Sequence, residues 1–216
     1  RIAGNPDIRA VIITGEGRAF SAGQDLEERA SAFLSGELPD MHGSLGELYN
    51  PLVRRIAAMP VPIIAAVNGI AFGAGAAIAI SCDIVLAAES AKFQFGFVNV
   101  GLGPDSGASW SLPRLVGLQR AMDLAMTGRA VTGPEAERIG LVARCVPDDR
   151  LLAEALEIAH QLATKSSPAL STIKARMRDA SDLTLDQALD AERVAQAELG
   201  RTPDYRAAVL KFSKRT

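Results

Sequence analysis

No charged residue occurs between Arg55 and Asp83, and this stretch constrains the fold more than any other part of the sequence. It is long enough to cross a bilayer, which takes about 20 apolar residues. Prolines near its start and glycines in its middle interrupt it, so a membrane-spanning helix is disfavoured. We instead predict a buried strand over Val61–Val67, a turn over Asn68–Phe72 and a buried helix of small residues over Gly73–Ser81.

Strands and helices are predicted to alternate on both sides of this stretch. Apolar, β-branched runs predict further strands at residues 9–15, 83–88, 92–95 and 142–146. Helical spacing or start signals predict helices at residues 48–59, from 107 to about 128, from 132, and from 148 onward. Between them, residues 15–23 are predicted to be a loop and residues 25–46 a partly helical surface segment. The pattern indicates an α/β core over residues 1–147 and an α-helical region over residues 148–216.

The composition is that of a globular protein and excludes several classes. The 216 residues are 48% hydrophobic and 22% charged, which suits one domain with an appendage and excludes a disordered chain. A net charge of -2 gives no positive surplus for binding nucleic acid. Cys82 and Cys145 cannot form a disulfide framework, so a reducing, cytoplasmic location is expected, and no signal peptide is predicted. His42 and His160 lack neighbours at metal-ligand spacing, so no metal site is predicted.

Two common catalytic motifs are only partly matched. Residues 107–111, Gly-Ala-Ser-Trp-Ser, come within one residue of the G-x-S-x-G elbow of serine hydrolases, but the last glycine is missing. Residues 73–78 lack the third small residue of a dinucleotide-binding loop, and no acid follows at the expected distance. Both hypotheses are therefore disfavoured.

Three segments of small residues share a physical theme. They lie at residues 19–26, 68–76 and 101–107, after a predicted strand or at the entrance of a predicted helix. Small residues let a ligand approach the backbone, and a helix entrance offers free N–H groups at the positive end of the helix dipole. Two such N–H groups aimed at one carbonyl oxygen form an oxyanion hole, and an acid beside it can move protons on adjacent carbons. The alternative is that these are three tight turns.

These segments resemble the crotonase (enoyl-CoA hydratase/isomerase) superfamily. Residues 20–26 read FSAGQDL, residues 65–75 read AAVNGIAFGAG, and residues 101–107 read GLGPDSG, in family order and at family spacing. The resemblance implies a spiral of ββα turns with a helical C-terminal trimerisation region. It also implies an enzyme that stabilises the enolate of an acyl-CoA thioester, the substrate, with no separate cofactor. A homotrimer or a dimer of trimers is the implied assembly.

The resemblance assigns expected roles to single residues. The backbone N–H groups of Gln24 and Ala74 are implied to be the two donors of the oxyanion hole. Ala22, Asp25 and Leu26 are implied to lie along the path of the coenzyme A adenine and pantetheine. Most of these roles belong to the main chain, which accounts for the small residues around them.

The acidic residues decide the reaction class. Family hydratases use two glutamates to position and split water, and the matching positions here hold Ala77 and Phe97. Asp105 remains, and an acid at this position resembles the isomerases of the family, including those that act on a ring epoxide in phenylacetate breakdown. We therefore expect an acyl-CoA isomerase in which Asp105 is the acid/base that moves a proton through a thioester enolate. Phe97 and Trp110 are expected to line the substrate pocket and to raise the pKa of Asp105.

Other interpretations of the same residues stay open. A helix N-cap is the structural alternative for Asp105. A hydratase that adds water through Asp105, and a catalytically weak acyl-CoA-binding protein, are the alternatives for the function. A dehalogenase of the family also has an aspartate here, but it needs a tryptophan where Phe97 stands and a histidine with which His42 does not align.

The ends of the chain carry weaker signals. The C-terminal residues Phe212, Lys214 and Arg215 resemble a segment that, in some family members, reaches the coenzyme A of a neighbouring subunit. The alternative is a frayed basic tail. The basic residues of a late helix are expected to form a solvated face: Lys174, Arg176 and Arg178. Family members carry a hairpin and a helix before the strand at residues 9–15, whereas at most eight residues precede it here. Those N-terminal elements are therefore expected to be missing from this sequence.

Overall fold

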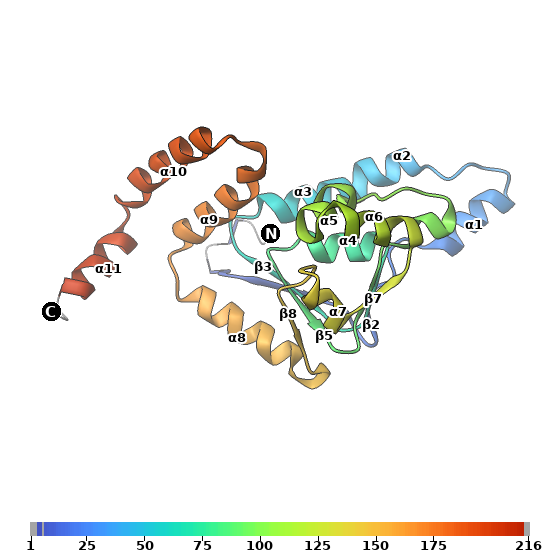
Figure 1. Ribbon diagram of the computed structural model, residues 1–216, viewed down its shortest axis with the longest axis horizontal. Helices are drawn as coiled ribbons and strands as arrows, with labels where there is room; N and C mark the ends of the chain where they lie inside the picture. Colours follow the sequence, from blue (N-terminus) through green and yellow to red (C-terminus); the bar gives the residue numbers. More distant parts are fainter. Residues whose placement is uncertain (1–3, 6, 214–216) are drawn as a thin grey trace.

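Two sheets form the centre of the part of the chain that the structure describes. The computed structural model describes residues 4, 5 and 7–213, and Figure 1 shows the helices arranged around the strands. The first sheet is parallel, in the order β1-β3-β5-β8; the second has the order β2-β4-β6-β7, with β7 antiparallel to β6. The strands are β1 (Val11–Thr14), β2 (Ala19–Ser21), β3 (Ile63–Val67), β4 (Ile70–Phe72), β5 (Ile84–Ala88), β6 (Lys92–Gln94), β7 (Ala130–Thr132) and β8 (Arg144–Val146).

The helices surround these sheets and continue beyond them. They are α1 (Leu26–Leu34), α2 (Met41–Ser44), α3 (Asn50–Ala58), α4 (Ala74–Ser81), α5 (Ala108–Val116), α6 (Leu118–Thr127), α7 (Gly133–Arg138), α8 (Leu151–Ala163), α9 (Ser167–Asp179), α10 (Leu185–Leu199) and α11 (Pro203–Ser213). A π-helical segment, Leu45–Tyr49, joins α2 to α3, so residues 41–58 are helical without a break. The predicted start of α7 is confirmed, because the Thr132 hydroxyl accepts the N–H of Glu135.

Successive strands alternate between the two sheets. β1, β3 and β5 enter the first sheet, β2, β4 and β6 enter the second, and helix follows each pair. This spiral of ββα turns confirms the α/β class and the architecture that the resemblance implies. Two predictions were wrong in detail: β2 lies inside the predicted loop at residues 15–23, and β4 inside the predicted turn at residues 68–72. Each has three residues, too few for a periodic pattern, and pairing with neighbouring strands defines them.

The uncharged stretch of the sequence forms the core. All five residues of β3 are buried, as expected for a parallel strand covered on both faces. The small side chains of α4 let that helix lie inside the protein, in contact with β4, α3 and α5, while α8 packs against β1, β3 and β5. No helix within the described residues is both long and apolar enough to span a membrane.

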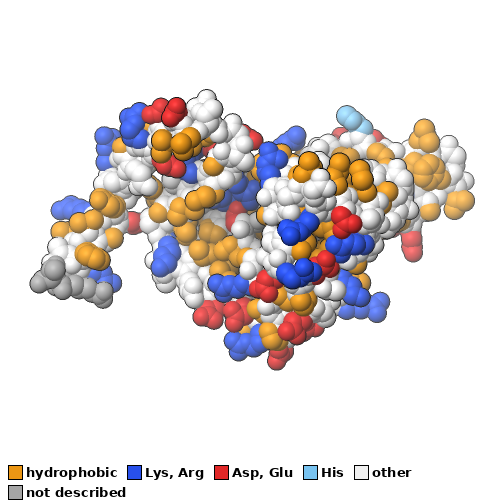
Figure 2. Space-filling view, in the orientation of Figure 1, with side chains coloured by type: hydrophobic (Ala, Val, Ile, Leu, Met, Phe, Trp, Pro, Cys, Tyr) orange, Lys and Arg blue, Asp and Glu red, His pale blue; other side chains and the backbone are white. Residues whose placement is uncertain are grey.

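The last two helices extend away from the sheets. Figure 1 shows α10 and α11 as a projecting arm that ends at the C-terminus, and we call residues 185–213 the C-terminal arm. Large apolar side chains of the arm are exposed, as Figure 2 shows: Leu185, Leu189, Val194, Tyr205, Val209, Leu210 and Phe212. Several large exposed apolar side chains on one projecting element are typical of protein–protein contacts.

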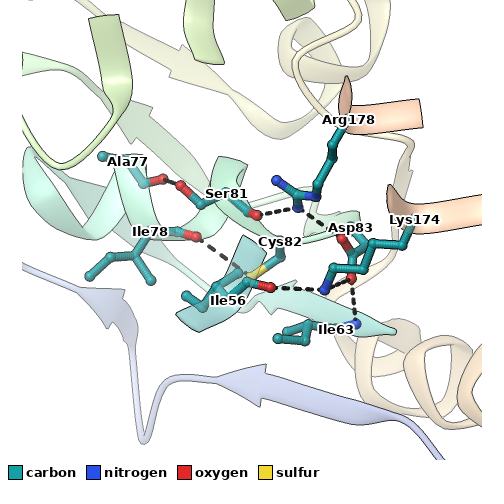
Figure 3. A network of polar contacts seen from close by, with 9 residues as sticks. All are labelled: Ile56, Ile63, Ala77, Ile78, Ser81, Cys82, Asp83, Lys174 and Arg178. Carbon is teal, nitrogen blue, oxygen red and sulfur yellow. Dashed lines mark hydrogen bonds and ion pairs between the residues drawn. The ribbon is translucent and has the colours of Figure 1, made fainter. Parts of the chain in front are cut away.

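A buried ion cluster joins α9 to the core (Figure 3). The carboxylate of Asp83 pairs with Lys174 Nζ at 2.7 Å and with Arg178 Nη2 at 2.8 Å, and it accepts the N–H of Ile63 at 2.9 Å. The Lys174 side chain is only 8% exposed, and burial lowers its pKa. We call Asp83, Lys174 and Arg178 the Asp83 cluster.

The expectation of a solvated basic face on α9 was therefore wrong for two of its three members. Lys174 and Arg178 turn inward because Asp83 supplies a buried counter-charge that the local sequence pattern does not reveal. Each cation also donates to a main-chain carbonyl near the end of a helix: Lys174 to Ile56 of α3 and Arg178 to Ser81 of α4, both at 2.8 Å. Arg176 pairs near the surface with Asp179.

Candidate active site

The three small-residue segments belong to neighbouring strands of the second sheet. Two of them contain β2 and β4 and continue past these strands, and the third comes after β6 and a 3-10 helical segment, Gly96–Val100; β2, β4 and β6 are adjacent and parallel. Parallel strands that run side by side end at the same edge, where ligands commonly bind in open α/β structures. The spiral therefore places on neighbouring strands three segments that lie about 30 to 80 positions apart in the sequence.

The backbone around Gly23 and Gly73 brings two N–H groups close together. A Cβ on Gly23 would lie 2.7 Å from the Phe72 carbonyl oxygen and 3.4 Å from the Ala74 nitrogen, so the two segments touch. Gly73 has φ +53° and ψ -119°, which favours glycine, and it turns the chain into α4. Among the described residues, the backbone N–H groups of Gln24 and Ala74 donate to no protein acceptor. Two backbone donors are thus free for a ligand.

The residues expected along the coenzyme A path lie beside these donors. Ala22 and Leu26 are exposed. The Asp25 carboxylate caps α1, because its Oδ1 accepts the N–H groups of Glu27 at 2.9 Å and Glu28 at 3.3 Å. This cap orients the start of α1 next to the first donor.

Asp105 is a half-buried acid in the third segment. Burial raises its pKa, and a hydrogen bond from Ser106 Oγ to its Oδ1, at 2.8 Å, offsets part of that rise. The predicted direction of the shift is confirmed. The N-cap of α5 is Gly107, so the Asp105 carboxylate does not cap this helix, and the structural alternative for Asp105 is wrong.

The backbone beside Asp105 is strained. Ser106 is buried and has φ +51°, a left-handed conformation that residues with a Cβ seldom adopt. Strain of this kind is retained where the surrounding structure requires it, and it is frequent at functional sites. Here it directs the Ser106 hydroxyl onto the acid.

Phe97 and Trp110 lie in different places. The buried Phe97 ring comes within 3.8 Å of the position of a Cβ on Gly73, so it forms an apolar wall at the entrance of α4. Trp110 is 42% exposed and stacks against the guanidinium of Arg114 at 4.1 Å. It lines a cavity of about 580 Å³ between α5 and α9, and the described lining of that cavity includes neither Asp105 nor Phe97.

Tyr49 is a site residue that the sequence analysis did not predict. It ends the π-helical segment and is half-buried. Burial and the Asp105 carboxylate both raise the pKa of Tyr49, while Arg29 lowers it, so the phenol lies within electrostatic reach of the acid. A π-helical segment has no sequence pattern of its own, although such segments are frequent at functional sites.

No metal centre is formed by the residues that the structure describes. They contain no group of three or more His, Cys, Asp or Glu side chains placed to hold an ion. His42 and His160 are exposed, and the thiols of Cys82 and Cys145 are free. The Cys82 thiol lies at the far end of α4, where burial raises its pKa to about 12.

Comparisons with known proteins agree with this geometry. The sequence model of the family described as "Enoyl-CoA hydratase/isomerase" matches residues 1–216. A 1,2-epoxyphenylacetyl-CoA isomerase of Escherichia coli is 45% identical, over 95% of this chain and 78% of that protein. A probable enoyl-CoA hydratase of Rhodobacter capsulatus is 40% identical, over 95% of this chain and 78% of that protein.

A solved structure shows the same fold. A putative enoyl-CoA hydratase/isomerase from Mycobacterium abscessus superposes with a TM-score of 0.92 at 34% sequence identity, covering 99% of this chain and 82% of that one. The fold, the paired backbone donors and the sequence similarity point the same way. The chain belongs to the enoyl-CoA hydratase/isomerase family, the crotonase superfamily.

Proposed function

We propose that the protein is an acyl-CoA isomerase in which Asp105 moves a proton through a thioester enolate. The thioester oxygen sits between the N–H groups of Gln24 and Ala74, which stabilise the negative charge that develops on it. Asp105 removes a proton from a carbon near the thioester and returns it to a carbon further along the acyl group. The same carboxyl takes and gives the proton, so one acid/base suffices.

The observation that carries this proposal is the identity of the acids at the site. The positions matching the two hydratase glutamates hold Ala77 and Phe97, which are buried and apolar, and the third segment presents Asp105. The raised pKa of Asp105 supports the role, because a carboxylate that binds a proton more readily is the stronger base for the first proton abstraction. The similarity to an isomerase of Escherichia coli supports it as well.

A second candidate function is hydration of a 2-enoyl-CoA, with water activated through Asp105. The 40% identity to a probable enoyl-CoA hydratase is the observation in its favour. It is the weaker candidate, because Ala77 and Phe97 cannot take or give the protons of water.

The test is an assay of purified protein with a 3-enoyl-CoA and a 2-enoyl-CoA, followed by mass spectrometry. We expect conversion of the 3-enoyl to the 2-enoyl thioester without mass change, and a loss of about 10²- to 10⁴-fold in Asp105→Asn. Asp123→Asn, an exposed aspartate of α6, is the matched control. Isomerisation at the wild-type rate by Asp105→Asn would exclude the role, and a gain of one water on the 2-enoyl thioester would favour the hydratase.

The assembly, the coenzyme A contacts and the cellular location that the resemblance implies are part of the same proposal. We infer a homotrimer or a dimer of trimers, formed through helices within residues 148–216, and the exposed apolar side chains of the C-terminal arm support this. Ala22, Asp25 and Leu26 are proposed to contact coenzyme A. A cytoplasmic location and the absence of a separate cofactor complete the proposal. Of the C-terminal residues expected to reach a neighbour's coenzyme A, Phe212 is 82% exposed, whereas Lys214 and Arg215 lie outside the described residues.

A further inference from the structure

Helix α4 carries a candidate oxyanion donor at its entrance, the Ala74 N–H, but its own side chains hold it only loosely in register. Seven of its eight residues are buried, and they are glycine, alanine, isoleucine and serine. The Ser81 hydroxyl turns back onto the helix and donates to Ala77 O at 2.8 Å. Side-chain ridges keep packed helices in register, and side chains this small form shallow ridges. Packing therefore restrains α4 sideways more than along its axis.

A single guanidinium ties the other end of α4 to the first sheet, as Figure 3 shows. Arg178 Nη2 donates to Ser81 O and to Asp83 Oδ1, both at 2.8 Å. Asp83 is fixed to β3, because its Oδ2 accepts the N–H of Ile63 at 2.9 Å and its own N–H donates to Ile63 O at 2.9 Å. β3 is buried along its whole length between β1 and β5. Through Arg178, the last carbonyl of α4 thus has a fixed position relative to the first sheet.

Lys174 shares the same carboxylate but holds a different helix. Its Nζ lies 2.7 Å from Asp83 Oδ2 and donates to Ile56 O, near the end of α3, at 2.8 Å. Among the described residues it makes no hydrogen bond to α4. Lys174 and Arg178 therefore differ in one respect that bears on the candidate site: only Arg178 contacts the helix that carries the donor.

We propose that Arg178 is a positioning residue for the oxyanion hole: through Ser81 O it fixes α4 along its axis and so keeps the Ala74 N–H in place. This inference rests on the proposed function. At 1.5 Å per residue, the eight residues of α4 put the two ends about 10 Å apart. A hydrogen-bonded helix is a rigid element, so a displacement of its exit reaches its entrance. A misplacement of about 1 Å can cost about 10²-fold in rate.

The kinetic test compares Arg178→Met with Lys174→Met on a 3-enoyl-CoA. Each variant deletes one cation of the Asp83 cluster and leaves Asp83 the other, so thermal unfolding should show a loss of stability in both. We expect kcat to fall by about 10-fold or more in Arg178→Met and less than about 2-fold in Lys174→Met, with KM nearly unchanged in both. Arg176→Met, on the same helix but paired near the surface with Asp179, should change neither.

A kcat that falls equally in the two cluster variants would reduce Arg178 to a purely structural role and overturn the proposal, as would an unchanged kcat in Arg178→Met. Arg178→Gln is a milder second variant, because its amide stops short of the position of Nη2, and it should act in the same direction. Arg178→Lys restores a cation between Ser81 O and Asp83 and should return kcat to within about 3-fold of the wild type.

The carbonyl band of a bound thioester reports the donors without any turnover. Hydrogen bonds to the oxygen polarise the C=O bond and lower its stretching frequency. With butyryl-CoA carrying ¹³C at the thioester carbon as the probe, infrared difference spectra should show this lowering in the wild type and in Lys174→Met. Arg178→Met should lose part of it, and a full lowering there would overturn the proposal.

The same spectra separate this inference from the proposed function. A band that is not lowered in the wild type would mean that no oxyanion hole forms, which would defeat the proposed function and the role of Arg178 together. A lowered band in a wild type that isomerises no 3-enoyl-CoA would defeat the isomerase alone. The comparison of Arg178→Met with Lys174→Met would then still decide whether Arg178 positions the donor.

Discussion

The two ends of α4 are built in opposite ways. At its entrance there is no capping side chain, Gly73 turns the backbone, and the Ala74 N–H finds no acceptor among the residues that the structure describes. At its exit, Arg178 donates to the last carbonyl of the helix, that of Ser81, and the Ser81 hydroxyl donates to Ala77 O at 2.8 Å. One end is open and uncharged, and the other is closed by buried ions.

This contrast shows how a helix can keep unpaired donors in a fixed position. A cation near the C-terminus of a helix is favourable for the helix dipole, so the Asp83 cluster stabilises the exit. A firmly held exit fixes the rest of a short, buried helix, and the entrance can then present its N–H groups to a ligand without rearranging. Donors held in place before the reaction are the ones that lower a barrier most.

The largest expected effect comes from disturbing the entrance. In Gly23→Ala the new Cβ would meet the Phe72 carbonyl oxygen at 2.7 Å, and the residue would have to keep φ +81°. The Gln24 and Ala74 donors should move apart, and kcat should fall by about 10²-fold or more. Steady-state kinetics alongside thermal unfolding measures the effect.

Gly17→Ala is the matched control for this substitution. Gly17 has φ +68°, but a Cβ there would meet nothing within 4 Å. It imposes similar backbone strain without the contact, so stability should fall in both variants and activity only in Gly23→Ala. Wild-type kcat in Gly23→Ala would show that the entrance geometry is not what matters.

The second largest effect is expected when the ion pairs at the C-terminal end of α4 are removed, and it concerns the free energy of unfolding. Asp83→Asn removes the charge that Lys174 and Arg178 share in a buried place, and unfolding in urea should reveal a loss of about 3 to 5 kcal/mol. The control, Asp123→Asn, removes an exposed ion pair: Asp123 lies 2.9 Å from Arg129, and the side chains are 48% and 41% exposed, respectively. Its cost should stay below about 1 kcal/mol.

Cys82 gives a local readout of the same change. With its pKa near 12 the buried thiol should resist alkylation at pH 8 in the wild type and become reactive in Asp83→Asn. Loss of stability with Cys82 still protected would mean that the Asp83 cluster holds α9 but not the exit of α4.

The smallest effect concerns the acid itself. The folded-state pKa of Asp105 is raised, so its ionised form is disfavoured by folding; its stabilising contribution is complete below the unfolded pKa of about 3.9 and is lost as pH rises through the folded value. Asp105→Asn should therefore be more stable than the wild type at pH 7, by less than about 1 kcal/mol because the carboxyl is partly open to solvent. Urea unfolding at pH 7 and pH 4 should show this advantage shrinking on acidification, and an equal difference at both pH values would refute it.

Much of the site is local in the sequence and was predictable. The small residues around Gly23 and Gly73 mark places where backbone approaches backbone, and the helix expected at residues 73–81 is observed at Ala74–Ser81. The alternation of strands and helices was sufficient to predict the fold class, because each buried strand is a compact apolar run.

What could not be predicted depends on contacts between distant residues. Arg178 lies 95 residues from Asp83, and its own helix offers only alternate basic residues, which are typical of a solvated face. Trp110 was expected to line the substrate pocket; it lines the cavity between α5 and α9, whose lining includes α9 residues about 60 positions later in the sequence, such as Ile173. The position of Tyr49 depends on a π-helical segment, which has no periodicity to detect.

Mutations in the strands β2, β4 and β6 and mutations in the segment that connects β2 to β3 should have different consequences for this enzyme. The three strands lie side by side in the second sheet, whereas the connection from β2 to β3, residues 22–62, is mostly helical and lies outside the ladder. Insertions or substitutions in that connection leave the ladder hydrogen bonds untouched. Substrate preference can therefore diverge in one contiguous piece of gene, and this piece is the natural target for a library that seeks new acyl groups while retaining the same chemistry.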